Sequence, residues 1–75
     1  VDEGDILVID KALEAQDGDM AVCFVDGEFT LKHLRIREGR VTLVPANDKY
    51  PVIEVDAGTD FKMWGVVTYV IKKVR

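Results

Sequence analysis

The dipeptide Asp26-Gly27 constrains the fold of this 75-residue chain more than any other feature. It separates two largely apolar runs, and Asp-Gly in that position favours a two-residue hairpin turn. Both turn positions of such a hairpin need a positive φ angle, which these two residue types tolerate. We therefore predict an antiparallel pair of strands over residues 20–25 and 28–37, in the register that the turn fixes.

The other apolar runs are equally short, and alternating or continuous runs replace helical periodicity throughout. Residues 11–16 could form one helical turn but are too few to stand alone as a helix. Gly65 inside the last run indicates a bulge or bend rather than a break. Further strands are predicted over residues 6–9, 41–44, 53–55 and 61–74, with a loop over 46–51. Six strands joined by short turns predict an all-β domain whose antiparallel sheet curls or packs on itself.

Length and composition limit the class of protein. A chain of this size forms one domain with a thin core, and its 48% hydrophobic content and net charge of −4 argue against disorder. No apolar run approaches the ~20 residues that span a bilayer, and no signal peptide is apparent, so we expect no membrane association. The single cysteine excludes an internal disulfide framework and suits a reducing cytoplasm.

The charges are unevenly distributed along the chain. Residues 1–30 carry nine acids and one base, a net charge of −8, whereas residues 31–75 carry five acids and nine bases, a net charge of +4. Two surfaces of opposite sign could help a partner or a second copy to dock, or a soluble fold could simply segregate its charges. With a pI near 4.8 we expect no direct nucleic-acid binding, because phosphate contacts need clustered Lys and Arg.

The predicted register gives the hairpin two different faces. We expect the larger and more apolar face to belong to the core; it comprises Met20, Val22, Phe24, Phe29, Leu31 and His33. The other face comprises Ala21, Cys23, Val25, Glu28, Thr30 and Lys32. There Lys32 lies beside Ala21, over a hollow made by small side chains. Lys32 is then either an ordinary surface lysine or an amine partly withdrawn from water, and withdrawal favours the neutral form that can act as a base.

Other candidate side chains are few. His33 is the only histidine and Cys23 the only cysteine, so we expect no metal site and no cofactor, and a mid-strand cysteine is usually an inert small hydrophobe. Cys23 and His33 fall on opposite faces of the predicted hairpin and cannot form a catalytic couple. Serine is absent from the 75 residues, so no serine-based mechanism is complete within them.

The last predicted strand, residues 61–74, is apolar on both faces. One face carries Trp64, Val66, Thr68 and Val70, and the other carries Met63, Val67, Tyr69 and Ile71. Such strands are covered on both sides, here by the rest of the sheet or by a second subunit. A long unpaired edge at this strand would invite another chain, so we expect self-association.

Five segments, taken in order, form a recognisable set: EGDILVID (3–10), GDMAV (18–22), DGEFTLKHL (26–34), LVPAN (43–47) and WGVVTYVIK (64–72). This set resembles the carboxy-terminal domain of the UmuD and LexA family of self-cleaving proteins, peptidase S24. Each segment is weak alone, but together they cover essentially all 75 residues in the right order and spacing. The DGEFT turn and the ending KKVR are most similar to the UmuD branch. The resemblance implies small twisted antiparallel sheets of the LexA and signal-peptidase type.

The resemblance also implies a serine–lysine dyad, in which a neutral lysine removes the proton of a serine that attacks a peptide bond in the protein's own amino-terminal arm. The family's lysine falls on Lys32, which makes Lys32 the expected general base. The family's serine belongs to a Ser-Met turn a few residues before Glu3, and therefore upstream of Val1. We expect residues 1–75 to be a peptidase S24-like domain that is incomplete at its N-terminal side and has no peptidase activity alone.

For the intact protein the resemblance implies a damage-induced (SOS) protein of UmuD type, cytoplasmic and homodimeric. It would cleave itself on meeting a RecA–single-stranded DNA filament, and its processed form would join a translesion DNA polymerase of the UmuC type. A first alternative is the dimerisation and self-cleavage domain of a LexA-like or phage repressor, which a helix-turn-helix upstream of Val1 would favour. A second alternative is a non-catalytic β interaction module.

Overall fold

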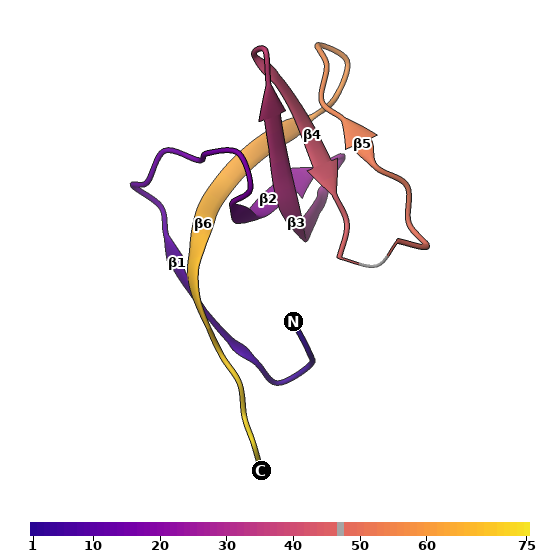
Figure 1. The fold of residues 1–75 in the computed structure, drawn as a ribbon. Helices are drawn as coiled ribbons and strands as arrows, with labels where there is room; N and C mark the ends of the chain where they lie inside the picture. Colours follow the sequence, from indigo (N-terminus) through magenta and orange to yellow (C-terminus); the bar gives the residue numbers. More distant parts are fainter. Residues whose placement is uncertain (47) are drawn as a thin grey trace.

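The computed structural model describes residues 1–46 and 48–75, which form one six-stranded antiparallel sheet (Figure 1). Its strands are β1 (Ile6–Asp10), β2 (Met20–Val25), β3 (Glu28–Arg37), β4 (Arg40–Val44), β5 (Ile53–Glu54) and β6 (Phe61–Ile71). Their order across the sheet is β1-β6-β2-β3-β4-β5. The all-β prediction is confirmed, although β5 and β6 are shorter than expected. Because the described residues form no helix, none of them forms a helix that could cross a membrane. Asn47, in the predicted loop, lies outside the described residues.

The predicted hairpin of β2 and β3 is present in the predicted register. The strands pair from Met20 opposite His33 to Val25 opposite Glu28, so only two residues remain for the turn. Asp26 has a φ of 47° in that turn, which accords with the tolerance of Asp for the left-handed region. Local turn chemistry alone therefore determines which side chains of the two strands face each other.

Strand β6 lies inside the sheet and not at its edge. It pairs with β1 on one side and with β2 on the other, and the two edge strands are β1 and β5. The expectation of an unpaired edge over residues 61–74 is therefore wrong. The physical reason is that the first strand of the chain pairs with the last, a contact between distant segments that no local pattern indicates.

Gly65 marks the bulge that was predicted inside the last strand. The register of β2 against β6 shifts between Val22 and Cys23, opposite this glycine. A Cβ atom at residue 65 would collide with the side chain of Ile9 and lie 3.4 Å from the carbonyl oxygen of Asp10. The absence of a side chain thus allows the end of β1 and the first residue after it, Lys11, to approach β6 closely.

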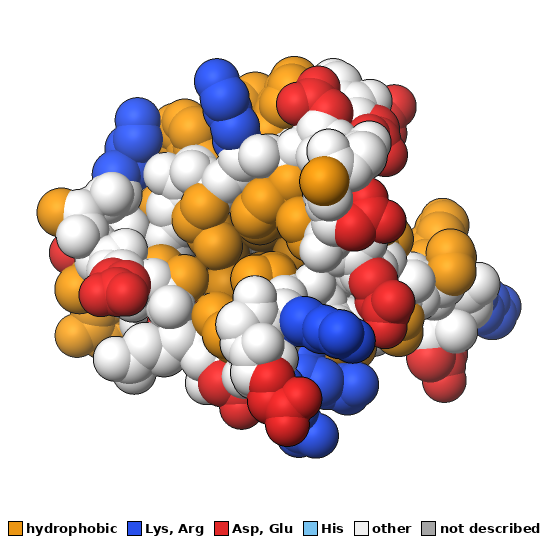
Figure 2. Space-filling view, turned by 90° about the horizontal axis from the view of Figure 1, so that it is seen from above, with side chains coloured by type: hydrophobic (Ala, Val, Ile, Leu, Met, Phe, Trp, Pro, Cys, Tyr) orange, Lys and Arg blue, Asp and Glu red, His pale blue; other side chains and the backbone are white. Residues whose placement is uncertain are grey.

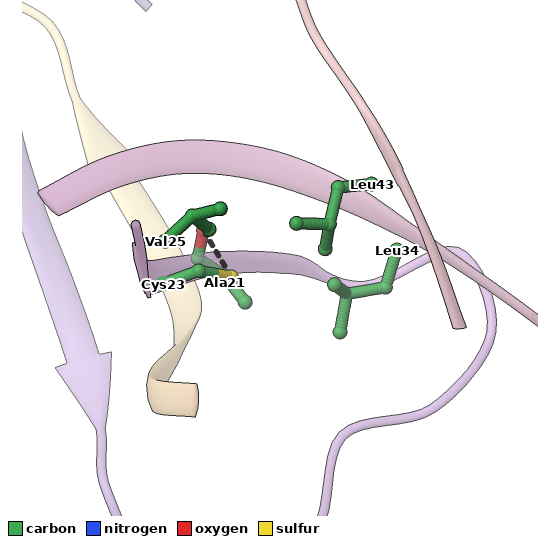
Figure 3. Close-up of a cluster of buried hydrophobic side chains, with 5 residues drawn as sticks. All are labelled: Ala21, Cys23, Val25, Leu34 and Leu43. Carbon is green, nitrogen blue, oxygen red and sulfur yellow. Dashed lines mark hydrogen bonds between the residues drawn. The ribbon is translucent and has the colours of Figure 1, made fainter. Parts of the chain in front are cut away.

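The core lies on the face of the hairpin that carries Lys32. Ala21, Cys23 and Leu43 are completely buried there, and Val25 and Leu34 are nearly so (Figure 3). Half-buried apolar side chains surround this cluster; they are Ala15, Ile36, Val41, Ile53, Val55, Phe61 and Met63. The core therefore draws on β2, β3, β4, β5, β6 and the connections between them, and the sheet curls around it.

The face that was expected to form the core is instead the outer face of the sheet. This correction concerns Met20, Val22, Phe24, Phe29, Leu31 and His33. Phe29 is 64% exposed, and His33 is exposed as well. The reason is the direction of the curl, because the concave side of a curled sheet has room for Ala21 and Cys23 but not for a row of large rings.

The concave side is not completely covered. Figure 2 shows apolar side chains at the bottom of a hollow, with both acidic and basic side chains around it. The connection before β2 closes part of this side, because its Ala15 packs against the core cluster. The end of the connection also continues the β2–β3 pairing beyond Met20. Its backbone exchanges two hydrogen bonds of 2.8 Å with Leu34, one from the Gly18 amide and one to the Asp19 carbonyl.

Candidate active site

Lys32 lies on β3 with its side chain on the concave, core-forming face. Its direct partner across the ladder is Ala21, and the residue as a whole is half-buried. The expectation that this lysine stands over a hollow of small side chains is therefore confirmed in its geometry. Whether the amine acts as a base stays a prediction.

Two completely buried side chains form the floor beneath Lys32. Ala21 lies opposite the lysine and Cys23 lies opposite Thr30, so both project toward the concave side. The Cys23 thiol donates a weak hydrogen bond of 3.9 Å to the Ala21 carbonyl (Figure 3). Small side chains at these two positions leave space above the floor for a long one, and the stem of Lys32 can occupy it.

The positive charge of Lys32 affects the pKa of the Cys23 thiol in this floor. Burial raises the pKa of the Cys23 thiol above its ordinary value, and the nearby positive charge of Lys32 opposes that shift. The net direction is upward, so the thiol stays protonated and is a poor nucleophile. Cys23 is therefore the inert small hydrophobe that the sequence predicted, placed within electrostatic reach of the lysine.

A shallow hollow of about 260 Å³ opens beside Lys32. Its lining combines an apolar part with two carboxylates; it consists of Val25, Asp26, Glu28, Thr30, Lys32 and Ile53. The hollow has room for a segment of polypeptide to bring a hydroxyl group near the amine. The sequence did not predict that Ile53 lines this hollow. Ile53 belongs to β5, a strand of two residues that gives almost no sequence signal.

Of the other predicted candidates, Cys23 lies in the floor beneath Lys32, and His33 is kept away from the lysine. His33 is exposed on the outer face and Cys23 is buried on the concave one, so the prediction that they cannot form a catalytic couple is confirmed. The Thr68 hydroxyl, in β6, donates to the Val8 carbonyl at 3.2 Å. Among the described residues no group of histidine, cysteine, aspartate or glutamate side chains is arranged to hold a metal ion.

The family model for peptidase S24-like proteins matches residues 1–68. The chain belongs to the peptidase S24-like family. The match covers the hairpin, Lys32 and both strands that contact β6. The family model thus agrees with the family that the five sequence segments indicated. In this family member the fold is all-β and Lys32 lies on the concave face.

Relatives of this S24-like domain include the proteins SamA and ImpA and a LexA repressor. The chain is 39% identical to protein SamA of Salmonella typhimurium over 72 residues, which are 96% of this chain and 49% of SamA. It is 40% identical to protein ImpA of Escherichia coli over 75 residues, which are 100% of this chain and 50% of ImpA. It is 34% identical to the LexA repressor of Paracidovorax citrulli over 70 residues, which are 93% of this chain and 31% of that repressor. The chain thus spans about half the length of SamA and ImpA.

Proposed function

We propose that the intact protein is a self-cleaving serine–lysine peptidase in which Lys32 is the general base. The observation that carries the proposal is the half-buried position of Lys32 above the buried pair Ala21 and Cys23. Ala21 and Cys23 present apolar atoms on one side of this lysine. The hollow beside it leaves the other side open to a second segment.

The proposed step has a simple proton balance. A serine hydroxyl, supplied by a Ser-Met turn upstream of Val1, attacks the carbonyl carbon of a peptide bond in the protein's own arm. The Lys32 amine takes the hydroxyl proton as the carbon–oxygen bond forms, and returns it to the leaving amine when the peptide bond breaks. Water then hydrolyses the acyl-serine. Residues 1–75 supply the base for this sequence and no serine, so by themselves they are inactive.

The intact protein is proposed to be of UmuD type. Support comes from the similarity to SamA and ImpA over nearly all of the chain. On this reading it is a cytoplasmic SOS protein that cleaves itself at a RecA–single-stranded DNA filament and then serves a UmuC-type translesion polymerase. The similarity to a LexA repressor supports a second candidate, the self-cleavage domain of a transcriptional repressor. Specific binding of the intact protein to an operator sequence would favour that second candidate.

A homodimer is part of the proposal, and the ribbon of β1 and β6 supports it. Ile6 lies opposite Ile71 and Val8 opposite Tyr69, and all four side chains are exposed. They share one face of the ribbon, because directly opposed residues project to the same side. Two strands with an uncovered apolar face are marginally stable in water, and the free edge of β1 can accept a further strand. A second copy would cover both features.

The test follows self-cleavage of the intact protein at alkaline pH, where a larger fraction of any lysine is neutral. We expect the Lys32→Ala variant to stay intact while the parent protein yields two fragments, resolved on a gel and identified by mass spectrometry. His33→Ala is the matched control, since it changes the next residue of β3 on the outer face and should cleave normally. Cleavage by Lys32→Ala at the parent rate would remove Lys32 from the mechanism.

A further inference from the structure

Three aromatic rings meet on the outer face of the sheet. The ring centroids of Phe24 and Phe29 are 5.1 Å apart, and those of Phe29 and Trp64 are 6.0 Å apart, both in edge-to-face contact. They come from β2, β3 and β6, yet Phe29 is 64% and Trp64 42% exposed. Aromatic residues in contact are normally part of a core or an interface. We call these three rings the outer aromatic cluster.

A row of cationic side chains continues from this cluster across the same face. Lys62 lies opposite Phe24, and Arg35 and Arg37 follow Phe29 at even spacing along β3. Since successive residues of a strand alternate between faces, these side chains project to the outer side. Arg40 of β4 joins them, because it lies directly opposite Arg37.

The strands that carry this row bring no carboxylate to the outer face, although Glu54 of the neighbouring β5 lies on that face opposite Thr42. Within β2, β3, β4 and β6 the only carboxylate is Glu28, which faces the concave side. Among the residues that the structure describes, none of the row's four side chains forms an ion pair. Arg37 and Arg40 stand directly across the ladder, an arrangement in which like charges destabilise a sheet. An anionic ligand over this pair would remove the repulsion.

The indole of Trp64 already attracts a cation. The Lys11 amine lies 4.8 Å from the centroid of the ring, a distance typical of a cation–π contact. A fifth positive charge is therefore placed at the end of the cluster opposite the arginines. Positive groups thus lie on both sides of the exposed rings.

We propose that the outer face binds single-stranded nucleic acid. Unpaired bases would stack on Phe29 and Trp64, and phosphates would contact the arginines. Exposed rings beside a cationic track are what proteins use to hold single strands, because every base presents a flat face for stacking. A duplex hides these base faces, and an acidic peptide offers no flat face for the rings to stack on. Such binding is separate from self-cleavage and does not use Lys32.

The net charge of −4 led us to expect no such binding, but it is an average over the whole chain. On the fold, eight residues separate Phe29 from Arg37, so rings and cations extend over roughly 26 Å at about 3.3 Å per residue. The far end is a hollow of about 390 Å³, whose lining includes Glu38, Glu54 and Asp56 besides the three arginines. These carboxylates line the same hollow as the three arginines, so phosphates would contact the arginines only from the side that faces the rings.

The test measures binding of a fluorescently labelled oligothymidylate of about fifteen nucleotides, a length in the range of one small β domain, to the intact protein by anisotropy. Phe29→Ala should weaken binding about tenfold through lost stacking, and Phe29→Tyr, which keeps a ring, should retain it. If about three phosphates are neutralised, a fivefold rise in salt should weaken binding about 30-fold. Arg35→Gln with Arg37→Gln should reduce that salt dependence. Tyr50→Ala, which removes an exposed aromatic ring in the β4–β5 connection, is the matched control.

Further arms separate the possible ligands. An oligouridylate tests RNA against DNA, and tighter binding of either single strand supports the proposal. Equal competition by duplex DNA or by polyglutamate would overturn the proposal, since it would show a general attraction for polyanions without stacking. No anisotropy change at low salt would overturn it too. So would loss of a homodimer in Phe29→Ala, measured by sedimentation, together with unchanged oligonucleotide binding, because the rings would then be a protein interface.

Discussion

Ala21 lies directly across the β2–β3 ladder from Lys32 and is completely buried. The small side chain of Ala21, the smallest in the core, leaves the space that the side chain of Lys32 occupies. The packing of the core therefore affects the position of the proposed general base. Enlarging one member of the pair must displace the other. Ala21 is therefore a positioning residue for the proposed general base.

The first prediction concerns this pair. Ala21→Leu should destabilise the protein by about 1–3 kcal/mol, since it overpacks a filled site, and should slow self-cleavage at least tenfold under conditions where circular dichroism shows a folded sheet. Urea midpoints and cleavage rates of the intact protein provide the two measurements. Ala12→Leu, in the exposed β1–β2 connection, is the control and should leave both unchanged. A folded Ala21→Leu protein that cleaves at the parent rate would show that Lys32 does not depend on this space.

The second prediction concerns Gly65. Gly65→Ala should cost about 1–3 kcal/mol, because the new methyl group and the Ile9 side chain cannot both keep their places. In an Ile9→Ala background the same change should cost less, and a double-mutant cycle measures the difference. Gly58→Ala is the control, because the nearest atom to its added Cβ is a side-chain oxygen of Asp56 at 3.4 Å. Additive effects of Gly65→Ala and Ile9→Ala would contradict the proposed collision.

The third prediction is a pH dependence at the ends of the chain. The Asp5 carboxylate accepts hydrogen bonds from the Asp2 amide at 2.8 Å and from Lys72 at 3.0 Å. The Asp2 amide first, and then Lys72, lower the pKa of Asp5. Hydrogen bonds to Asp5 and then to Asp2 raise the pKa of Lys72. The contact therefore favours the charged form of both groups in the folded state.

The signs of the two effects are opposite. Asp5 contributes stability above its ordinary pKa of ~3.9, and loses it as pH falls through the lowered folded value. Lys72 contributes fully below its ordinary pKa of ~10.4, and loses its contribution as pH rises through the raised folded value. Lys72→Met should therefore lower the urea midpoint most between these limits, with a difference that shrinks at both ends and in high salt. Lys73→Met is the control. A Lys72→Met effect that ignores pH would exclude the ion pair as its cause.

The fourth prediction tests the proposed homodimer. Ile71→Asp should weaken dimerisation, because it introduces a charge into the exposed apolar face of the β1–β6 ribbon, and sedimentation of the intact protein at micromolar concentration measures the result. Val74→Asp is the control, since Val74 lies beyond β6 and is 98% exposed. A dimer of undiminished stability in Ile71→Asp would assign the interface to another surface.

Local signals predicted those parts of the fold that local chemistry determines. Asp26-Gly27 determines a two-residue turn, and this turn determines the register of β2 against β3. The register correctly placed Lys32 beside Ala21, on the opposite face of the hairpin from His33. Which face of the hairpin would be buried was predicted wrongly, because that depends on the direction in which the whole sheet curls. Phe24 and Phe29 alternate as core residues do, and nothing within the hairpin shows that β4 and β5 cover the other side.

Local sequence patterns also could not predict the contacts between distant segments of the chain. Ile53 reaches the hollow beside Lys32 through a ladder of two residue pairs, too short to detect. The pairing of β1 with β6 depends on Gly65 admitting Ile9, a requirement that becomes visible only when both strands are present. The proposed catalytic role of Lys32 comes from the motifs, and the prediction of its small-residue floor comes from the register.

The pairing of β6 with both β1 and β2 has a consequence for the order in which the chain folds. Both partners are made before β6 is synthesised, so each presents an unsatisfied row of amides and carbonyls until the final strand arrives. Sheets that depend on such distant pairings fold slowly, and waiting strand edges are prone to aggregate. The folding nucleus available during synthesis is the β2–β3–β4 meander, whose turns close locally. Insertion of β6 between β1 and β2 is then the late step that completes the sheet. A chain on a ribosome stalled before residue 61 would leave unpaired those edges of β1 and β2 that later bind β6.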